Sequence, residues 1–223
     1  MEPIEVYALR LDEEAAAQAE GYLAYLSPGR RKAVRGYRSP LMRARTIAAE
    51  LLARVLLAAR SGKLPLELAI CRDARGKPYS PDGAAFFSWS HGDAWVALSI
   101  GGEQNGVDVE GPRRRTVVSA IARRFFRPEE RRALDEAAES ERSRLFLYYW
   151  TMKESYLKYT GEGLAGGLES VDTAALWKGD GPAAGRTFLL SDGAVVGVCA
   201  PSGHLPDAVQ EISFAALRAE LSK

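Results

Sequence analysis

Two acidic residues that could bind a metal ion stand two positions apart in the segment GVDVE (106–110). Side chains of a strand alternate between its two faces, so Asp108 and Glu110 would share one face while Val109 points into the core. Two carboxylates side by side repel each other unless a cation lies between them, and Mg²⁺ prefers oxygen ligands of this kind. The alternative is an exposed strand end whose acids are solvated or paired with the arginines at 113–115.

A second acid–base pair lies in the segment WTMKESYLK (150–158). In a helix, Lys158 falls one turn after Glu154, so these two side chains share a face, and Lys153 precedes Glu154 directly. A glutamate beside a metal can act as a further ligand and can accept a proton from an attacking hydroxyl. The alternative is a surface ion pair that contributes only about 0.2–0.5 kcal/mol. The apolar neighbours in the segment favour buried partners for these charges.

Basic and polar side chains that could bind phosphate occur in the first half of the chain. Arg45 opens an amphipathic segment, Lys77 follows a glycine in the turn GKP, and Ser90 and His91 end a strand-like run. Helix starts and guanidinium groups are frequent phosphate ligands. The structural alternatives stay open here, because basic runs such as 30–38 are usually solvated faces and a lone histidine is usually a structural residue.

The elements that must position these residues are a mixture of helices and strands. The sequence predicts helices around 47–56, 117–126 and 142–159, and strands around 4–9, 66–70, 84–90, 94–100, 106–110, 187–190, 194–199 and 209–214. A helix followed by strands occurs twice, which is typical of an α+β protein made of two similar halves. The break at Gly111 and Pro112 divides the chain into halves 1–110 and 111–223.

Composition excludes several classes of protein. The 223 residues are 47% hydrophobic and 26% charged, as in an ordinary soluble globular protein. The net charge of +1 argues against a whole-protein nucleic-acid binder. The two cysteines, Cys71 and Cys199, are too far apart for a metal knuckle or a disulfide framework. No apolar run approaches the roughly 18 residues of a membrane span, and the acidic start differs from a secretory signal. We therefore expect a cytoplasmic protein that does not bind a membrane.

Taken together, the motifs resemble a known family. In chain order they are SPGRR, TIAAELLAR, GKPY, FSWSHG, GVDVE, RFF and WTMKESYLKYTGEGL. With this order and separation, over about residues 27–164, the chain is similar to the 4′-phosphopantetheinyl transferase superfamily, specifically its Sfp-like type. GVDVE and WTMKESYLK are the most specific blocks, and their joint occurrence is hard to obtain by chance.

The resemblance implies a pseudo-two-fold pair of similar halves, with coenzyme A and Mg²⁺, or Mn²⁺ in its place, in the cleft between them. It implies transfer of the phosphopantetheine arm of coenzyme A to a serine of an apo acyl or peptidyl carrier protein, with release of 3′,5′-ADP. Asp108, Glu110 and Glu154 match the family's metal ligands, and Glu154 also matches the group that helps to deprotonate the serine. Lys158 matches a lysine that stabilises the pyrophosphate. Two fused halves imply a monomer.

The resemblance also implies the coenzyme A contacts and the carrier-docking region. The predicted coenzyme A contacts are Arg30, Arg45, Thr46, Lys77, Ser90, His91 and Lys153. Arg45 and His91 suit the 3′-phosphate, and Thr46 lies near the adenine side. Because carrier proteins are typically acidic around their serine, a basic and apolar docking face is predicted from Arg113 to Arg115, Val117, Val118, Ile121, Arg123, Arg124 and Arg127.

The chain departs from the family pattern at three positions. Trp89 and Asp93 flank the Ser-His pair, which affects the fine placement of that loop, and Ala33 stands where some relatives carry a phosphate-binding lysine.

Two rival functions use the same residues. A Mg²⁺-dependent phosphohydrolase or nuclease would cleave a phosphoester without a carrier protein, and a non-catalytic module would bind an acidic partner or RNA through its basic clusters.

Overall fold

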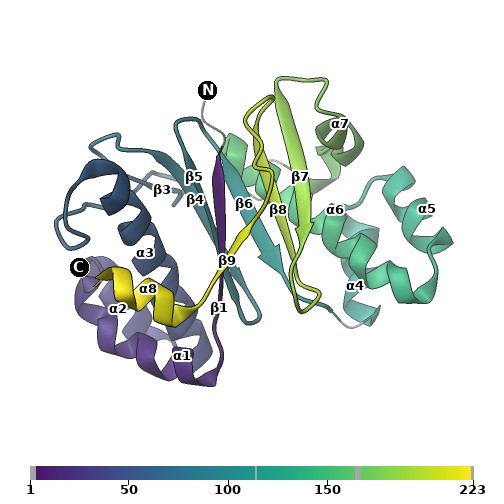
Figure 1. Cartoon of the computed structure of the whole chain (residues 1–223). Helices are drawn as coiled ribbons and strands as arrows, with labels where there is room; N and C mark the ends of the chain where they lie inside the picture. The colour runs from purple at the N-terminus through teal and green to yellow at the C-terminus, as the bar shows by residue number, and fades with distance from the viewer. Residues whose placement is uncertain (1–3, 114, 164–166, 222–223) are drawn as a thin grey trace.

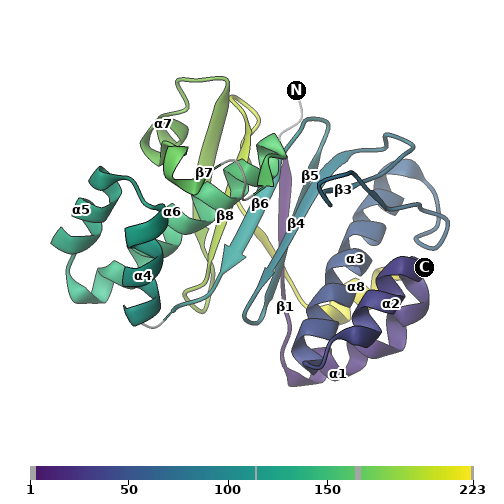
Figure 2. The ribbon, with the colours of Figure 1, turned by 180° about the vertical axis from the view of Figure 1, so that it is seen from behind.

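The computed structural model describes residues 4–113, 115–163 and 167–221, and for Arg115 the backbone alone. It contains both helices and sheets, so the predicted α+β class is confirmed. Two lobes lie side by side, with the sheets in the middle and the helices on the outside (Figures 1 and 2). Among the described residues, no helix has both the length and the apolar character that crossing a membrane requires.

Each lobe is built on the same strand–helix–strand–strand unit. The first repeat contains β1 (Glu5–Arg10), α3 (Pro40–Ser61), β4 (Phe86–Gly92) and β5 (Trp95–Gly101). The second repeat contains β6 (Gly106–Glu110), α6 (Glu139–Thr160), β7 (Ala183–Leu189) and β8 (Val195–Pro201). The strands are ordered β4-β5-β1 in one sheet and β7-β8-β6 in the other, and all of these neighbours pair antiparallel. The topology therefore repeats although no residue-level repeat is visible in the sequence.

The remaining elements decorate the two repeats. They are α1 (Glu13–Ala19), the 3-10 helix η1 (Glu20–Tyr25), α2 (Pro28–Gly36), β2 (Cys71–Arg72), β3 (Pro78–Tyr79), α4 (Arg115–Phe125), α5 (Pro128–Glu136), the 3-10 helix η3 (Leu168–Ser170), α7 (Thr173–Lys178), β9 (Gln210–Ile212) and α8 (Phe214–Leu221). The strand predicted at 66–70 is wrong. Residues 64–70 form turns and irregular chain, and Leu66 exposes 60% of its surface.

The strand pairing corrects the predicted division at residue 110. β6 lies before that point in sequence but pairs with β8, so it belongs to the second repeat. β9 lies after it but pairs in parallel with β1, and α8 packs on the core of the first repeat. Figure 1 shows this C-terminal segment crossing to the lobe that contains α3. The boundary between repeats therefore falls in the turn 102–105, and the C-terminal segment of β9 and α8 returns to the first repeat.

The two sheets meet along β4 and β6, which are joined by side chains. The Val107 amide donates to Ser88 Oγ at 3.3 Å, and Asn105 Nδ2 donates to the Phe86 carbonyl at 3.2 Å. These contacts advance in the same direction along both strands, so β4 and β6 run parallel. Within the described sheets no backbone ladder links the two strands, and side chains of both repeats can therefore meet at this seam.

Glycines in the second sheet let α6 approach closely. A Cβ atom on Gly106 would lie 2.1 Å from the Ser155 carbonyl oxygen, and one on Gly197 would lie 2.5 Å from the Thr151 carbonyl oxygen. Both distances are far below any real Cβ contact, so a side chain at either position would push the helix away from its sheet. The glycine of GVDVE thus fixes how near α6 lies to β6.

Candidate active site

The centre of the candidate site is Lys158, which reaches from α6 across the seam. Its Nζ donates to Asp108 Oδ1 on β6 at 2.7 Å and to Ser90 Oγ on β4 at 2.8 Å. The Ser90 hydroxyl donates to the same Asp108 oxygen at 2.7 Å. Three predicted residues from two repeats therefore form one hydrogen-bonded triangle, and the predicted surface-pair alternative for Lys158 does not describe its contacts.

The second carboxylate oxygen of Asp108 has no partner. Asp108 is only 4% exposed, and its Oδ2 is buried with no hydrogen bond among the described residues. Buried carboxylate oxygens almost always accept from a donor or bind a cation. Asp108 therefore presents an unused acceptor inside the seam.

Glu154 lies beside this triangle with a strongly shifted acidity. Burial, together with the negative charges of Asp108 and Glu110, raises the pKa of Glu154 to about 7 against the opposing effect of Lys158. Among the described residues its carboxylate has no hydrogen-bond partner. A carboxyl group with a pKa near neutrality is suited to take up and release a proton at physiological pH.

Glu110 occupies the outer end of the same strand. Its Oε1 accepts from Trp150 Nε1 at 3.2 Å, and its Oε2 forms an ion pair with Arg113. Burial raises the pKa of Glu110 and Asp108 adds to the rise, whereas Arg113 lowers it. The expected alternative of an acid paired with the arginine run thus holds for Glu110 in this arrangement.

The three carboxylates suit a hard cation chemically but do not form a closed metal site. In the described part of the chain, no three His, Cys, Asp or Glu side chains are grouped as metal ligands. Lys158 occupies one oxygen of Asp108, and Arg113 occupies one of Glu110. Asp108 Oδ2 has no hydrogen bond among the described residues, and burial and the charge of Asp108 raise the pKa of both Glu110 and Glu154, so a Mg²⁺ ion would neutralise negative charge gathered here.

Positive side chains of the first repeat gather on the α3 side of β4. Burial lowers the pKa of His91, and the charges of Arg45 and Lys158 lower it further. Burial also lowers the pKa of both Arg30 and Arg45. The Nε atoms of both arginines are buried without a hydrogen bond among the described residues, although Arg30 Nε lies 3.9 Å from Glu50 Oε2. Guanidinium donors without hydrogen bonds in a positive cluster favour an anion such as phosphate.

Trp89 and Arg72 lie in this cluster, although neither was predicted from the sequence as a binding residue. Trp89 is flanked by two guanidinium groups, with Arg30 Cζ 5.7 Å and Arg72 Cζ 5.5 Å from its ring centroid. Trp89 and Arg72 also line a cavity of about 220 Å³ that reaches Lys158 on the second repeat. Strand alternation from His91 would have placed Trp89 on the same face, whereas no local signal marks Arg72.

Lys153 is a correction to the predicted coenzyme A contacts. It is fully buried, and its Nζ donates to the carbonyls of Leu168 at 2.9 Å and Val171 at 3.0 Å. Its third contact is an ion pair at 2.9 Å with Glu130 of α5. An ammonium group has three donors, and all are used inside the second repeat, so Lys153 is a structural residue.

Thr46 and Lys77 were also predicted to contact coenzyme A, and neither is free to do so in this arrangement. Thr46 is 1% exposed on the buried side of α3, so it has no open surface for an adenine ring. Lys77 Nζ contacts three backbone carbonyls, those of Lys158, Asn105 and Tyr159, at 2.6, 3.3 and 3.4 Å. Its donors are therefore occupied, and this arrangement leaves none for a phosphate.

Comparison with known proteins gives a consistent result. A family model described as the 4′-phosphopantetheinyl transferase superfamily matches residues 104–196. The 4′-phosphopantetheinyl transferase HetI from a Nostoc species is 30% identical over 176 residues, which cover 76% of this chain and 74% of HetI. The 4′-phosphopantetheinyl transferase Sfp from Bacillus subtilis is 24% identical over 222 residues, which cover 95% of this chain and 98% of Sfp.

The matched region coincides with the candidate site. Residues 104–196 include the whole of β6 and α6, and thus Asp108, Glu110, Glu154 and Lys158. The Nostoc and Bacillus proteins extend the similarity across both repeats, which confirms the family resemblance of the motifs. The chain therefore belongs to the 4′-phosphopantetheinyl transferase superfamily and is an enzyme of that transferase class.

Proposed function

We propose that the protein transfers the 4′-phosphopantetheine arm of coenzyme A to a serine of an apo acyl or peptidyl carrier protein and releases 3′,5′-ADP. The observation that carries the proposal is the meeting of Lys158, Ser90 and Asp108 at the seam, beside a Glu154 carboxyl whose pKa is about 7. Phosphoryl transfer depends mainly on alignment and charge stabilisation. A cation and a proton acceptor held together between two repeats supply both requirements.

The reaction balances without a covalent enzyme intermediate. The carrier serine oxygen bonds to the phosphorus nearest pantetheine, and the bond from that phosphorus to the bridging oxygen breaks. The bonding electrons leave with 3′,5′-ADP, and the serine proton passes to the Glu154 carboxylate. In this proposal the Lys158 ammonium stabilises the charge on the pyrophosphate. The nucleophile thus comes from the partner protein.

Asp108, Glu110 and Glu154 would hold a Mg²⁺ ion in this function. When bound, Mg²⁺ supplies charge neutralisation and orients the pyrophosphate oxygens. Glu110 would have to leave Arg113 to join the other two carboxylates. Mg²⁺ dependence is part of the proposal, and Mn²⁺ is an alternative ion with similar ligand preferences.

The positive cluster of the first repeat would bind the nucleotide part of coenzyme A. Arg30 and Arg45 each have a buried guanidinium nitrogen that makes no hydrogen bond among the described residues, and their positive charges act on His91. These features support the predicted contact with the 3′-phosphate. The negative charge of a bound phosphate would also relieve the repulsion that lowers the pKa of His91.

The carrier protein would dock beside α4. The last turn of α4 carries Arg123 and Arg124, both exposed, and Val117 is 39% exposed on the same helix. Val118 is buried in the core and cannot take part, and Arg127 is paired with acids of its own repeat. Arg114 lies outside the described residues. Charge reversal at Arg123 and Arg124 should raise the KM for the carrier, and an unchanged KM would remove this docking face.

The proposal is tested by intact-protein mass spectrometry. Apo acyl and apo peptidyl carrier proteins are incubated with the enzyme, coenzyme A and Mg²⁺, with EDTA and a carrier lacking the acceptor serine as controls. We expect a metal-dependent mass gain of one phosphopantetheine arm that needs the serine. Cleavage of coenzyme A without a mass gain would favour a phosphohydrolase, and no reaction of coenzyme A would favour a binding module. A cytoplasmic, monomeric enzyme stays a prediction.

A further inference from the structure

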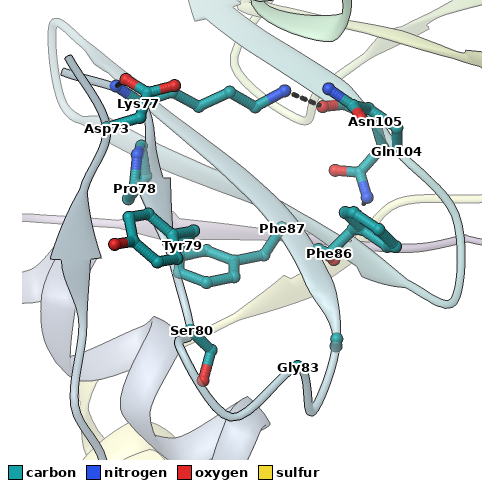
Figure 3. A pocket seen from close by; sticks show the side chains of 11 residues that line it. Asp73, Lys77, Pro78, Tyr79, Ser80, Gly83, Phe86, Phe87, Gln104 and Asn105 are labelled. Carbon is teal, nitrogen blue, oxygen red and sulfur yellow. Dashed lines mark hydrogen bonds between the residues drawn. The ribbon is translucent and has the colours of Figure 1, made fainter. Parts of the chain in front are cut away.

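The C-terminal end of α6 is held by side chains from outside its own repeat. Lys77 lies in the hairpin between β2 and β3, and its Nζ donates to the Lys158 carbonyl at 2.6 Å. The same ammonium contacts the carbonyls of Asn105 at 3.3 Å and Tyr159 at 3.4 Å. Figure 3 shows the extended Lys77 side chain crossing from the hairpin to Asn105. The first repeat therefore contacts the backbone of the helix that carries Glu154 and Lys158.

Two further donors act on the same helix end. Arg75 Nη1 donates to the Gly161 carbonyl at 2.9 Å, and Gln104 Nε2 donates to the Tyr159 carbonyl at 3.3 Å. Arg75 belongs to the hairpin of the first repeat, and Gln104 to the turn 102–105 between the repeats. Three side chains thus converge on carbonyls 158, 159 and 161, and we call this set the α6 clamp.

The physical basis is the unsatisfied end of a helix. The last four carbonyls of an α-helix have no intrahelical partner, and they carry a partial negative charge that favours cations. In α6 the chain then turns at Gly161, which has φ 74° and returns its N–H to the Leu157 carbonyl. The clamp supplies donors to the carbonyls that this turn leaves open.

Lys158 is held both by its side chain and by its backbone carbonyl. The Lys158 side chain contacts Ser90 and Asp108, while the Lys158 carbonyl accepts from Lys77. Glu154 lies one turn earlier on the same helix, so its position follows that of the clamped end. A loosened end would let both side chains move relative to β4.

We infer that Lys77, together with Arg75 and Gln104, is a positioning residue that holds α6 and its Lys158 in register with the first repeat. This deepens the proposed function and rests on it for the role of Lys158. The three donors of the Lys77 ammonium are matched by three carbonyls, which differs from a direct phosphate contact. Burial also lowers the pKa of Lys77, as expected for an ammonium held between backbone groups.

Hydrogen–deuterium exchange of the ligand-free protein tests the clamp. In Lys77→Met, amides 155–163 should exchange about tenfold faster, because the helix end loses its donors. Lys77→Arg should restore protection, since a guanidinium can donate to the same carbonyls. Gln104→Ala, which removes no charge, should shift exchange in the same direction by less. Lys63→Met is the matched control, because Lys63 contacts only Asp82 in its own repeat among the described residues.

Binding and kinetics distinguish the clamp from a phosphate contact. We expect Lys77→Met to lower kcat about tenfold while the Kd for coenzyme A changes less than about twofold. Unchanged exchange in Lys77→Met, or a large rise in Kd with unchanged kcat, would overturn the inference. A wild-type enzyme that modifies no carrier would instead refute the proposed function, and the exchange result would be independent of it.

Discussion

The long helices of the two repeats carry the same acid–base spacing with different outcomes. In α3, Glu50 and Arg54 are 2% and 4% exposed and contact each other at 3.0 Å. Glu50 also accepts from the Ser27 amide at 3.1 Å, and Arg54 donates to the carbonyls of Pro65 and Leu68 at 2.8 Å each. Glu50 Oε2 also lies 3.9 Å from Arg30 Nε. All of these partners belong to the first repeat, so the pair is satisfied there and links α3 to the segments around it.

The pair in α6 is open by comparison. Lys158 contacts Asp108 in its own repeat and Ser90 across the seam, and Glu154 has no hydrogen-bond partner among the described residues. The spacing of four residues is therefore not what makes a site. An acid–base pair stays structural when neighbouring backbone groups satisfy it, and it becomes available for chemistry when it faces a gap between two repeats.

The packing of the two helices differs in the same way. α3 buries large aliphatic residues as well as alanines, and the glycines of the first sheet, Gly92 and Gly101, lie against other elements. α6 lies directly on glycines of its own sheet, where a Cβ on Gly197 would lie 2.5 Å from the Thr151 carbonyl oxygen and one on Gly185 would lie 2.2 Å from Met152 Sδ. The position of α6 thus depends on strand glycines that have no side chain. A small substitution at one of these glycines would therefore move Glu154 and Lys158.

Replacing Glu154 should give the largest loss of activity. Glu154→Gln keeps the shape of the side chain but removes the proton acceptor and its charge. We expect transfer to fall about 10²–10⁴-fold with the fold intact, measured as the rate of carrier modification and by circular dichroism. Glu162→Gln, which removes an exposed acid just beyond the same helix, should leave the rate within about twofold. Near-normal rates in Glu154→Gln would refute its role.

A methyl group on Gly106 should displace α6. In Gly106→Ala the new Cβ would lie 2.1 Å from the Ser155 carbonyl oxygen and 2.4 Å from the Tyr159 amide. Overpacking of this kind costs about 1–3 kcal/mol of unfolding free energy, and activity should fall further than stability explains. Gly102→Ala is the control, because its Cβ would meet no atom within 4 Å. Equal behaviour of the two variants would show that α6 does not rest on Gly106.

Breaking the Glu50–Arg54 pair of α3 should lower the free energy of unfolding and leave the transfer reaction intact. Glu50→Gln leaves the Arg54 guanidinium buried without its counter-charge, which destabilises a protein by about 3–5 kcal/mol. Urea unfolding measures this loss, and kcat per folded molecule at saturating coenzyme A should stay near the wild-type value. Saturation is needed because Glu50 also lies beside Arg30, a predicted coenzyme A contact. The exposed pair Glu20–Arg43 offers a control, since Glu20→Gln should cost less than about 1 kcal/mol. A catalytic defect in folded Glu50→Gln would contradict the contrast between the helices.

The pH dependence of stability gives the most specific effect. The pKa of Glu154 is about 7 in the folded protein and near 4.5 when unfolded, so the folded state holds the extra proton between these values. Its contribution to stability is therefore fully present below about pH 4.5 and is lost as the pH rises to about 7. Unfolding free energies measured in EDTA should fall less steeply over this window in Glu154→Gln than in the wild type. Parallel curves would mean that the carboxyl is not perturbed.

The sequence was sufficient to predict the site residues that short motifs with strand or helix spacing identify. Strand alternation placed Asp108 and Glu110 together, and helical spacing placed Glu154 near Lys158. It could not distinguish Lys158, which enters the seam, from Lys153, which is buried against Glu130 and two carbonyls. That difference depends on backbone groups far away in the chain, and residue types do not encode it.

The division into halves failed for a related reason. Hydrophobic alternation identifies a strand but not its partner, so β6 and β9 were assigned to the wrong halves. The Lys77 contacts were also invisible, because they join a hairpin to the carbonyls of a helix about eighty residues later. Tertiary pairing, rather than local pattern, decides both features.

The most direct test of the account compares the two helices in one experiment. At saturating coenzyme A, mass spectrometry would follow transfer of the phosphopantetheine arm to an apo carrier protein by equal amounts of folded wild type, Glu50→Gln and Glu154→Gln. We predict that Glu50→Gln modifies the carrier at the wild-type rate and that Glu154→Gln leaves it in the apo form. An active Glu154→Gln, or an equal loss in both variants, would contradict the claim that the open pair of α6 performs the chemistry.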